Sequence, residues 1–200
     1  AAMNVGALLA RSEALLFLDD DVVPAPDLLE AHRRALGRPD APPAVCGQVI
    51  QPWHEGPVSA VRDFALEFDA AYDKPCEILT LMAGNFSIRR DTFLRAGGFD
   101  ENFSGPCYRL ESELSYRLYR LLGRKVAFAP DARIVHLKAG GGTRAFGDKD
   151  TWAHVGGSIG DYYFALRCLP LVACLKHCLT RFVRAPVNRN TARRPWLIPS

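Results

Sequence analysis

The sequence predicts an α/β domain, and three observations point to this fold class. Short apolar runs typical of strands alternate with segments whose apolar residues recur at helical spacing. The run 14–18 is wholly apolar and stops at three aspartates, which is typical of a strand buried on both faces in a parallel sheet covered by helices. With 200 residues, 48% hydrophobic and 24% charged, the chain can bury a core, which excludes a coiled coil, collagen and wholesale disorder.

The first third of the chain predicts a helix, a strand and a second helix. Apolar residues at helical spacing follow Asn4, a residue type that caps helices, so we expect a helix over 4–10. The apolar strand over 14–18 comes next. Pro24 and Pro26 open a helix over 27–36, which has an acid in its first turn and arginines in its last.

The remainder continues the alternation. A stripe of leucines at 110, 114, 118 and 121 predicts a helix that stops at Gly123. We expect further helices over 58–70 and 91–96, and strands over 45–50, 78–82, 86–88, 126–129 and 134–135.

Charge and cysteines bound the function. Beyond residue 160 lie seven of the 25 basic residues and a single one of the 22 acidic residues, Asp161. A body with a basic tail is not typical of a nucleic-acid-binding domain, whose positive charge should cover the binding face. The six cysteines form no C-x-x-C pair and are far too few for a disulfide scaffold, so we expect reduced thiols and a cytoplasmic protein.

We expect three regions: a catalytic domain over 1–147, a helical region over 148–183 broken by Pro170, and a basic tail over 184–200. No run of 18 apolar residues predicts a transmembrane helix. The segment 161–183 mixes apolar and basic residues. It is either a helix packed on the domain or a surface for peripheral contact with an anionic membrane, such as the inner face of the plasma membrane.

The three consecutive carboxylates Asp19, Asp20 and Asp21 are costly to place together unless a cation neutralises them, because like charges repel. Asp19 and Asp21 point the same way if the strand geometry continues. Carboxylates at a strand end suit Mg²⁺ or Mn²⁺ shared with substrate phosphates. The plain alternative is a solvated acidic turn.

Another interpretation starts from the same residues. An apolar strand followed by Asp19-x-Asp21 also fits the nucleophile motif of haloacid-dehalogenase-like phosphatases, in which the first aspartate attacks phosphorus. That class needs a downstream lysine and a second acidic pair, and neither is convincing in this sequence. A third interpretation is a non-catalytic fragment with only a binding role.

Four later motifs favour a different family. They are, in order, Ala83–Arg90, Ala96–Phe103, the helix start Leu110-Glu111, and the strand that leads through His136 into the glycines 140–142 with Thr143 and Arg144. Together with Asn4-x-Gly6 and Asp19-x-Asp21, this set resembles the inverting family 2 glycosyltransferases of GT-A fold over roughly residues 4–145. The resemblance implies a mixed sheet flanked by helices, which lacks its first strands because the N-terminal part of the family pattern is absent.

The resemblance also implies site residues. Asp19, Asp20 and Asp21 match the motif that binds the nucleotide and a divalent metal, with Asp21 and His136 as the metal ligands. Gly84 and Asn85 match the loop that lines the sugar and acceptor site. Thr143 and Arg144 match a flexible loop that closes over acceptor and donor.

The catalytic base implied by the resemblance is Glu111, although the partner acid of the family pair is replaced by Leu110. A helix start favours an ionised carboxylate, so a dipole-stabilising acid is the plain alternative. Glu113 is the other base candidate and is otherwise expected to contact the substrate. The implied reaction is metal-dependent, inverting transfer of a sugar, hexosyl in type, from a nucleotide-diphosphate donor to a hydroxyl of a glycan, lipid-linked or other acceptor, with Mn²⁺ or Mg²⁺ as cofactor.

Overall fold

The computed structural model describes residues 2–38, 40–52, 54, 68–103, 107–138 and 155–184, with the side chains of 155–158 and 181–184 left aside. The chain divides into two compact units. Unit 1 comprises Ala1–Asp100 with Glu111–Ala139, and unit 2 comprises Glu101–Leu110 with Gly140–Ser200. The predicted domain boundary at residue 147 lies outside the described residues.

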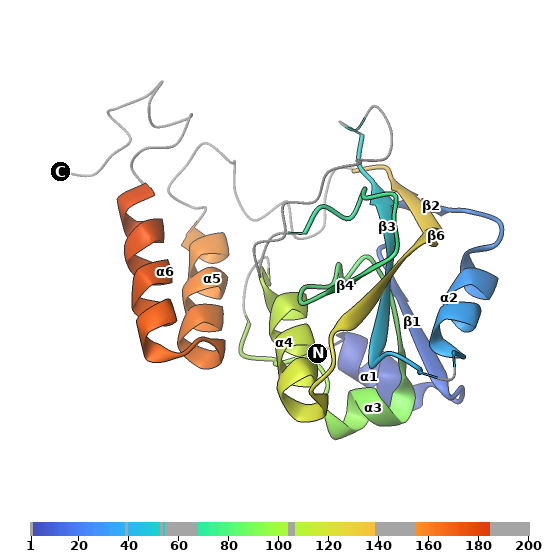
Figure 1. Cartoon of the computed structure of the whole chain (residues 1–200), viewed down its shortest axis with the longest axis horizontal. Coiled ribbons are helices and arrows are strands. Elements are labelled where there is room, and N and C mark those ends of the chain that lie inside the picture. The colour runs from blue at the N-terminus through green and yellow to red at the C-terminus, as the bar shows by residue number, and fades with distance from the viewer. Residues whose placement is uncertain are drawn as a thin grey trace. The chain divides into compact units, whose positions relative to one another are not determined.

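Unit 1 contains a mixed sheet with the strand order β1-β5-β3-β6-β2, and β4 also pairs with β6 (Figure 1). The pair β3–β6 is parallel, whereas the other pairs are antiparallel. The predicted α/β class with a mixed sheet is therefore confirmed. The strands are β1 (Ala14–Leu18), β2 (Val22–Pro24), β3 (Ala44–Ile50), β4 (Cys76–Ile78), β5 (Asn85–Arg89) and β6 (Val126–His136).

Helices cover both faces of this sheet. Figure 1 shows α2 on one side of the sheet and α4 on the other. The helices of unit 1 are α1 (Ala2–Leu9), α2 (Leu28–Leu36), α3 (Arg90–Arg95) and α4 (Leu110–Leu122), whose first residue is counted with unit 2. Alternation along the strands divides the core, because successive side chains point to opposite faces. Val45 and Val49 pack with Leu28 and Leu36 of α2. Phe86, by contrast, stacks on Phe17 at 4.7 Å between ring centroids.

The interpretation of 14–18 as a strand buried on both faces of a parallel sheet is wrong. β1 is the end strand of the path and pairs antiparallel with β5. Leu15 is buried, but Ala14 and Leu18 at its two ends are exposed. The apolar run reflects two half-covered faces, since Phe17 contacts the aromatic core while Leu16 packs against the cluster under α2.

Several element boundaries also differ from the prediction. The two expected strands over 126–135 are one strand, β6, in which three extra residues bulge between Ala129 and Arg133 opposite Gly47 and Gln48. β4 comes earlier than the expected strand 78–82. Of the helix expected over 58–70, residues 68–70 are not helical, and 58–67 lie outside the described residues. Leu121 is exposed although it continues the leucine stripe.

Unit 2 contains the helices α5 (Val155–Cys168) and α6 (Leu171–Arg184), with the predicted break at Pro170. Gly160 of α5 packs directly on the Tyr108 backbone, where any Cβ would collide with the carbonyl oxygen. Buried Arg109 pairs with Asp161 at 2.9 Å, and His177 of α6 lies 3.0 Å from the same carboxylate. These contacts join the segment before α4 to both helices.

Two findings concern the surroundings of the chain. The six cysteines all lie among the described residues, and none of them forms a disulfide bond. Among the described residues, none of the helices has the length and apolar character needed to cross a bilayer.

Candidate active site

Strand pairing brings Asp21 to His136, 115 residues later in the chain. Val22 of β2 lies opposite His136 at the end of β6, and the Leu137 N–H donates to the Asp21 carbonyl at 2.8 Å. Asp21 directly precedes β2, so its side chain meets the imidazole, with 2.9 Å between Oδ1 and Nε2. The two residues expected to share a metal ion are therefore adjacent.

Asp19 completes this cluster. Its Oδ2 lies 3.8 Å from His136 Nε2, and one ligand atom from each of Asp19, Asp21 and His136 lies within 4.8 Å of the others. The cluster is graded in exposure, since the His136 side chain is 7% exposed, Asp21 16% and Asp19 46%. Two carboxylates and one imidazole fit Mn²⁺ or Mg²⁺, and the open side at Asp19 leaves room for substrate oxygens. Asp20 is exposed and outside the cluster.

Gly84 supports Asp19 from the neighbouring strand. The Asp19 N–H donates to the Gly84 carbonyl, and a Cβ at Gly84 would lie 2.5 Å from Asp19 Oδ2. Any larger residue at position 84 would therefore displace this carboxylate. The predicted substrate-lining glycine is thus in contact with the metal-binding candidate.

Asn85 differs from its expected role, because its side chain has no exposed surface. Its amide Nδ2 donates to the carbonyls of Gln48 and Ala132, which holds the bulge of β6 against β3. Its Oδ1 therefore faces His32 Nε2, 2.9 Å away, as the acceptor. In this structure the Asn85 side chain joins β3 to the bulge of β6.

His32 is the buried residue that connects α2 to this network. Nε2 donates to Asn85 Oδ1, and Nδ1 lies 2.8 Å from the Ser87 hydroxyl, from which it accepts when the ring is neutral. Burial is the main cause that lowers the pKa of His32, opposed by the hydrogen bond to Asn85. Because both partners of His32 are more than 50 residues away in the chain, no local sequence pattern identifies this role.

Glu111 lies in the first turn of α4 and is partly exposed. Burial raises the pKa of the Cys46 thiol on β3 to about 12, with a smaller contribution from the charge of Glu111. Cys46 pairs with Phe86, two residues from Gly84.

Glu113 has a different environment from its neighbour. It is 1% exposed and accepts two hydrogen bonds from Arg117, at 2.9 and 2.5 Å. Arg117 also donates to the carbonyls of Ala96 and Gly98, in a turn where both Gly97 and Gly98 have positive φ. The Glu113 carboxylate, through Arg117, holds α4 to the turn after α3, whereas the sequence predicted a contact with substrate.

Thr143 and Arg144, expected in the closing loop, lie outside the described residues, as do the glycines at 140–142.

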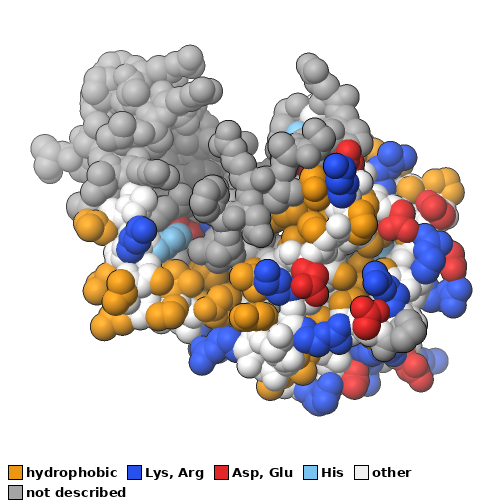
Figure 2. Space-filling view, in the orientation of Figure 1, with side chains coloured by type: hydrophobic (Ala, Val, Ile, Leu, Met, Phe, Trp, Pro, Cys, Tyr) orange, Lys and Arg blue, Asp and Glu red, His pale blue; other side chains and the backbone are white. Residues whose placement is uncertain are grey.

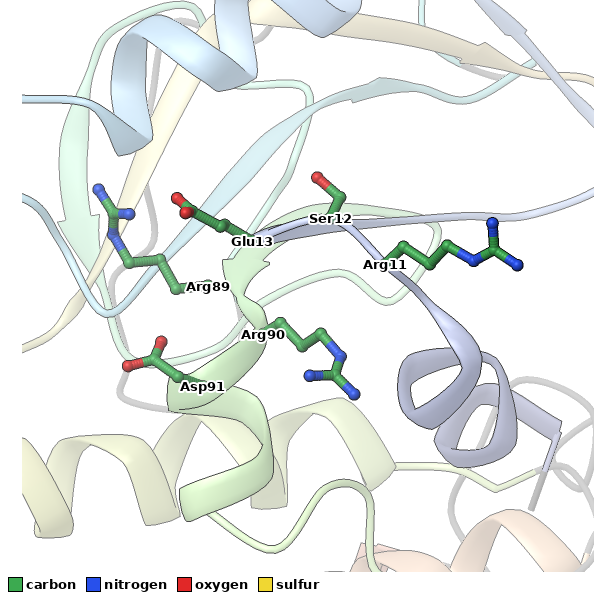
Figure 3. Close-up of a pocket in the computed structure, with 6 residues that line it drawn as sticks. All are labelled: Arg11, Ser12, Glu13, Arg89, Arg90 and Asp91. Carbon is green, nitrogen blue, oxygen red and sulfur yellow. The ribbon is translucent and has the colours of Figure 1, made fainter.

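A cavity of about 390 Å³ lies away from this cluster, at the opposite end of β1 and β5 (Figure 3). Ala14 pairs with Arg89 at that end, whereas Leu18 pairs with Asn85 near Asp19. The cavity is lined by three arginines, two acids and a serine, none of them a predicted site residue: Arg11, Ser12, Glu13, Arg89, Arg90 and Asp91.

Comparison with known proteins supports one family of folds. No protein-family profile matches the chain. A glucosyl-dolichyl phosphate glucuronosyltransferase of Haloferax volcanii is 27% identical over 146 residues, which are 66% of this chain and 45% of the relative. The chain thus spans less than half the length of that relative.

Two solved structures are also similar to this chain. The crystal structure of GalNAc-T7 with UDP, GalNAc and Mn²⁺ matches 100% of this chain and 45% of its own, with a TM-score of 0.51 at 15% identity. The mannosyltransferase PcManGT of Pyrobaculum calidifontis, in complex with GDP-Man and Mn²⁺, matches 98% of this chain and 61% of its own, with a TM-score of 0.47 at 16% identity. The chain has the GT-A fold of these structures, and its sequence is similar to that of a glycosyltransferase, as its motifs predicted.

Proposed function

We propose that this chain is the catalytic part of a glycosyltransferase that moves a sugar from a nucleoside-diphosphate donor to a hydroxyl acceptor with inversion. The observation that carries the proposal is the cluster of Asp19, Asp21 and His136, which the GT-A fold assembles from two distant segments. The leaving group of a sugar nucleotide is a diphosphate. A site for this group needs a positive charge, which a metal ion held by oxygen ligands supplies.

The cluster fits a divalent ion, and Mn²⁺ is the ion in the similar GalNAc-T7 structure, which also holds UDP. Asp19, Asp21 and His136 would hold Mn²⁺ or Mg²⁺, and the bound ion would neutralise charge on the departing diphosphate. Asp19, the most exposed of the three, and the adjacent Asp20 face solvent where the nucleotide can enter. Arg144 and Thr143 are proposed to close over donor and acceptor.

Glu111 is the proposed base. Inversion needs one group that takes the proton from the acceptor hydroxyl as the oxygen attacks the sugar carbon. Glu111 is partly exposed and lies in the first turn of α4. The burial of Glu113 and its two hydrogen bonds from Arg117 favour Glu111 over Glu113 as the base.

The proposed acceptor is a lipid-linked sugar. The similar H. volcanii protein is named for transfer to glucosyl-dolichyl phosphate, an acceptor carried by a membrane lipid. An acceptor of this kind would place the reaction at a membrane surface, and the cysteine usage favours the cytoplasmic side.

The test is metal-dependent nucleotide binding by calorimetry. With Mn²⁺ present, the chain should bind UDP or GDP, and Asp21→Asn or His136→Ala should weaken this affinity by about tenfold or more without unfolding the protein. Asp27→Asn is the matched control, because Asp27 is exposed and its side chain makes no capping bond.

Three outcomes would contradict the proposal. Unchanged affinity in both site variants would remove Asp21 and His136 from the metal site. Failure of the unaltered chain to bind either nucleotide with Mn²⁺ would favour a fragment without donor binding, and an aspartyl-phosphate trapped on Asp19 would favour the phosphatase interpretation.

A further inference from the structure

The helices α5 and α6 present a large apolar surface. Five long aliphatic side chains on them are between 61% and 79% exposed: Leu166, Leu171, Val172, Leu175 and Leu179. We call these five residues the hairpin face. Figure 2 shows apolar side chains gathered where Figure 1 draws these two helices. Exposed aliphatic residues that are clustered in this way mark a surface for interaction.

The orientation of α6 is determined by its other side. Cys174 is buried, and His177 contacts the Asp161 carboxylate of α5. Residues 171, 175 and 179 follow the spacing of one helical face, so they point away from these internal contacts. The exposure of the hairpin face is therefore a consequence of a fixed packing between the two helices.

The charge around the hairpin face has one sign. Lys176 follows Leu175 in the sequence and Arg167 follows Leu166, and both basic residues are exposed. Asp161 is the only acid beyond residue 160, and it is buried against Arg109 and His177. The sequence adds further arginines in the last turn of α6 and beyond it: Arg181, Arg184, Arg189, Arg193 and Arg194.

We propose that the hairpin face docks on an anionic lipid bilayer, with its aliphatic side chains in the interface and the basic residues against the headgroups. A helix that lies in a membrane interface combines an apolar face with Lys and Arg and is attracted by anionic lipid. A protein partner would need acidic groups to match these cations, and a second copy of this hairpin, whose one acid Asp161 is buried, would repel through the same charges. The lipid surface is the occupant that satisfies both the aliphatic and the cationic side chains.

This inference deepens the proposed function, since a docked hairpin would hold the enzyme at the membrane that carries its acceptor, but it can be tested without activity. The full chain is floated with vesicles of phosphatidylcholine alone or with phosphatidylglycerol added. The unaltered chain should float only with the anionic vesicles, and high salt should reduce the floated fraction.

The diagnostic variant is Leu175→Gln with Leu179→Gln, which removes two exposed leucines and no charge. It should lower the partition coefficient on anionic vesicles by about tenfold or more, because each leucine loses its apolar burial. Leu8→Gln with Leu9→Gln is the matched control, since these leucines are equally exposed on α1, which carries no charged residue. The control should float like the unaltered chain.

Three results would overturn the inference. They are no flotation of the unaltered chain, an equal loss in both double variants, or a stable dimer in solution that the Leu175/Leu179 variant dissociates. UDP binding with Mn²⁺, measured on the same samples, reports on the proposed function separately, so either proposal can fail without the other.

Discussion

At the scale of single residues, Glu111 and Glu113 show how two carboxylates on one helix turn acquire opposite roles. They are about 200° apart around α4, so they cannot face the same partner. Glu111 is partly exposed, whereas Glu113 is buried and accepts hydrogen bonds from Arg117. Of these two carboxylates, only that of Glu111 is open to solvent.

The two glutamines that replace these residues should therefore give different phenotypes. In the full-length enzyme, Glu111→Gln should lower turnover by roughly 10²–10⁴-fold with little change in donor affinity, because the lost base acts in the transition state. Glu113→Gln should lower the free energy of unfolding by about 2 kcal/mol, because it weakens buried charge-assisted hydrogen bonds. Urea unfolding and initial rates measure the two effects, and reversed phenotypes would move the base to Glu113.

At the scale of elements, the junction of β3, β5 and β6 depends on one glycine. Gly47 sits where β6 bulges, and a Cβ there would collide with the Ala132 carbonyl and the Asn85 amide. Those two groups are bonded to each other at 2.8 Å, so neither can move without breaking the network that includes His32. The close approach of three strands leaves no room for a side chain.

Gly47→Ala should therefore destabilise the chain by about 2–4 kcal/mol, since overpacking is added to lost hydrogen bonds. Gly6→Ala is the matched control, because Gly6 is exposed within α1 and a Cβ there meets nothing within 4 Å. That change should instead stabilise the chain by about 0.5–1 kcal/mol through helix propensity. Equal effects in the two variants, measured by urea unfolding, would contradict the crowded junction.

At the scale of the whole molecule, the buried His32 makes stability depend on pH. Its pKa is lowered in the folded chain, so the unfolded chain binds a proton near the ordinary value of 6.5 while the folded chain does not. The contribution of neutral His32 to the free energy of unfolding is fully present above pH 6.5, and it is lost as the pH falls through the lowered pKa. The slope from one proton is at most about 1.4 kcal/mol per pH unit.

The difference in unfolding free energy between the unaltered chain and His32→Gln isolates this contribution, because carboxylates elsewhere titrate in both. Below pH 6.5 the unaltered chain should lose its advantage progressively. An unfolding free-energy difference that stays constant from pH 7.5 to 5 would show that His32 titrates alike in both states.

The sequence by itself determined the α/β class, most of the helices and strands, the aspartates after β1, and His136 after β6, because propensity, apolar periodicity and motif order are local properties. Only the tertiary structure decided that β1 is an end strand, that Asp19 joins Asp21 and His136, that Asn85 is buried, and that Glu113 belongs to Arg117. Each of these depends on which strand pairs with which, or on how a helix packs. The antiparallel register of β2 on β6 joins residues 115 positions apart, and no local pattern encodes the partner of a carboxylate at that distance.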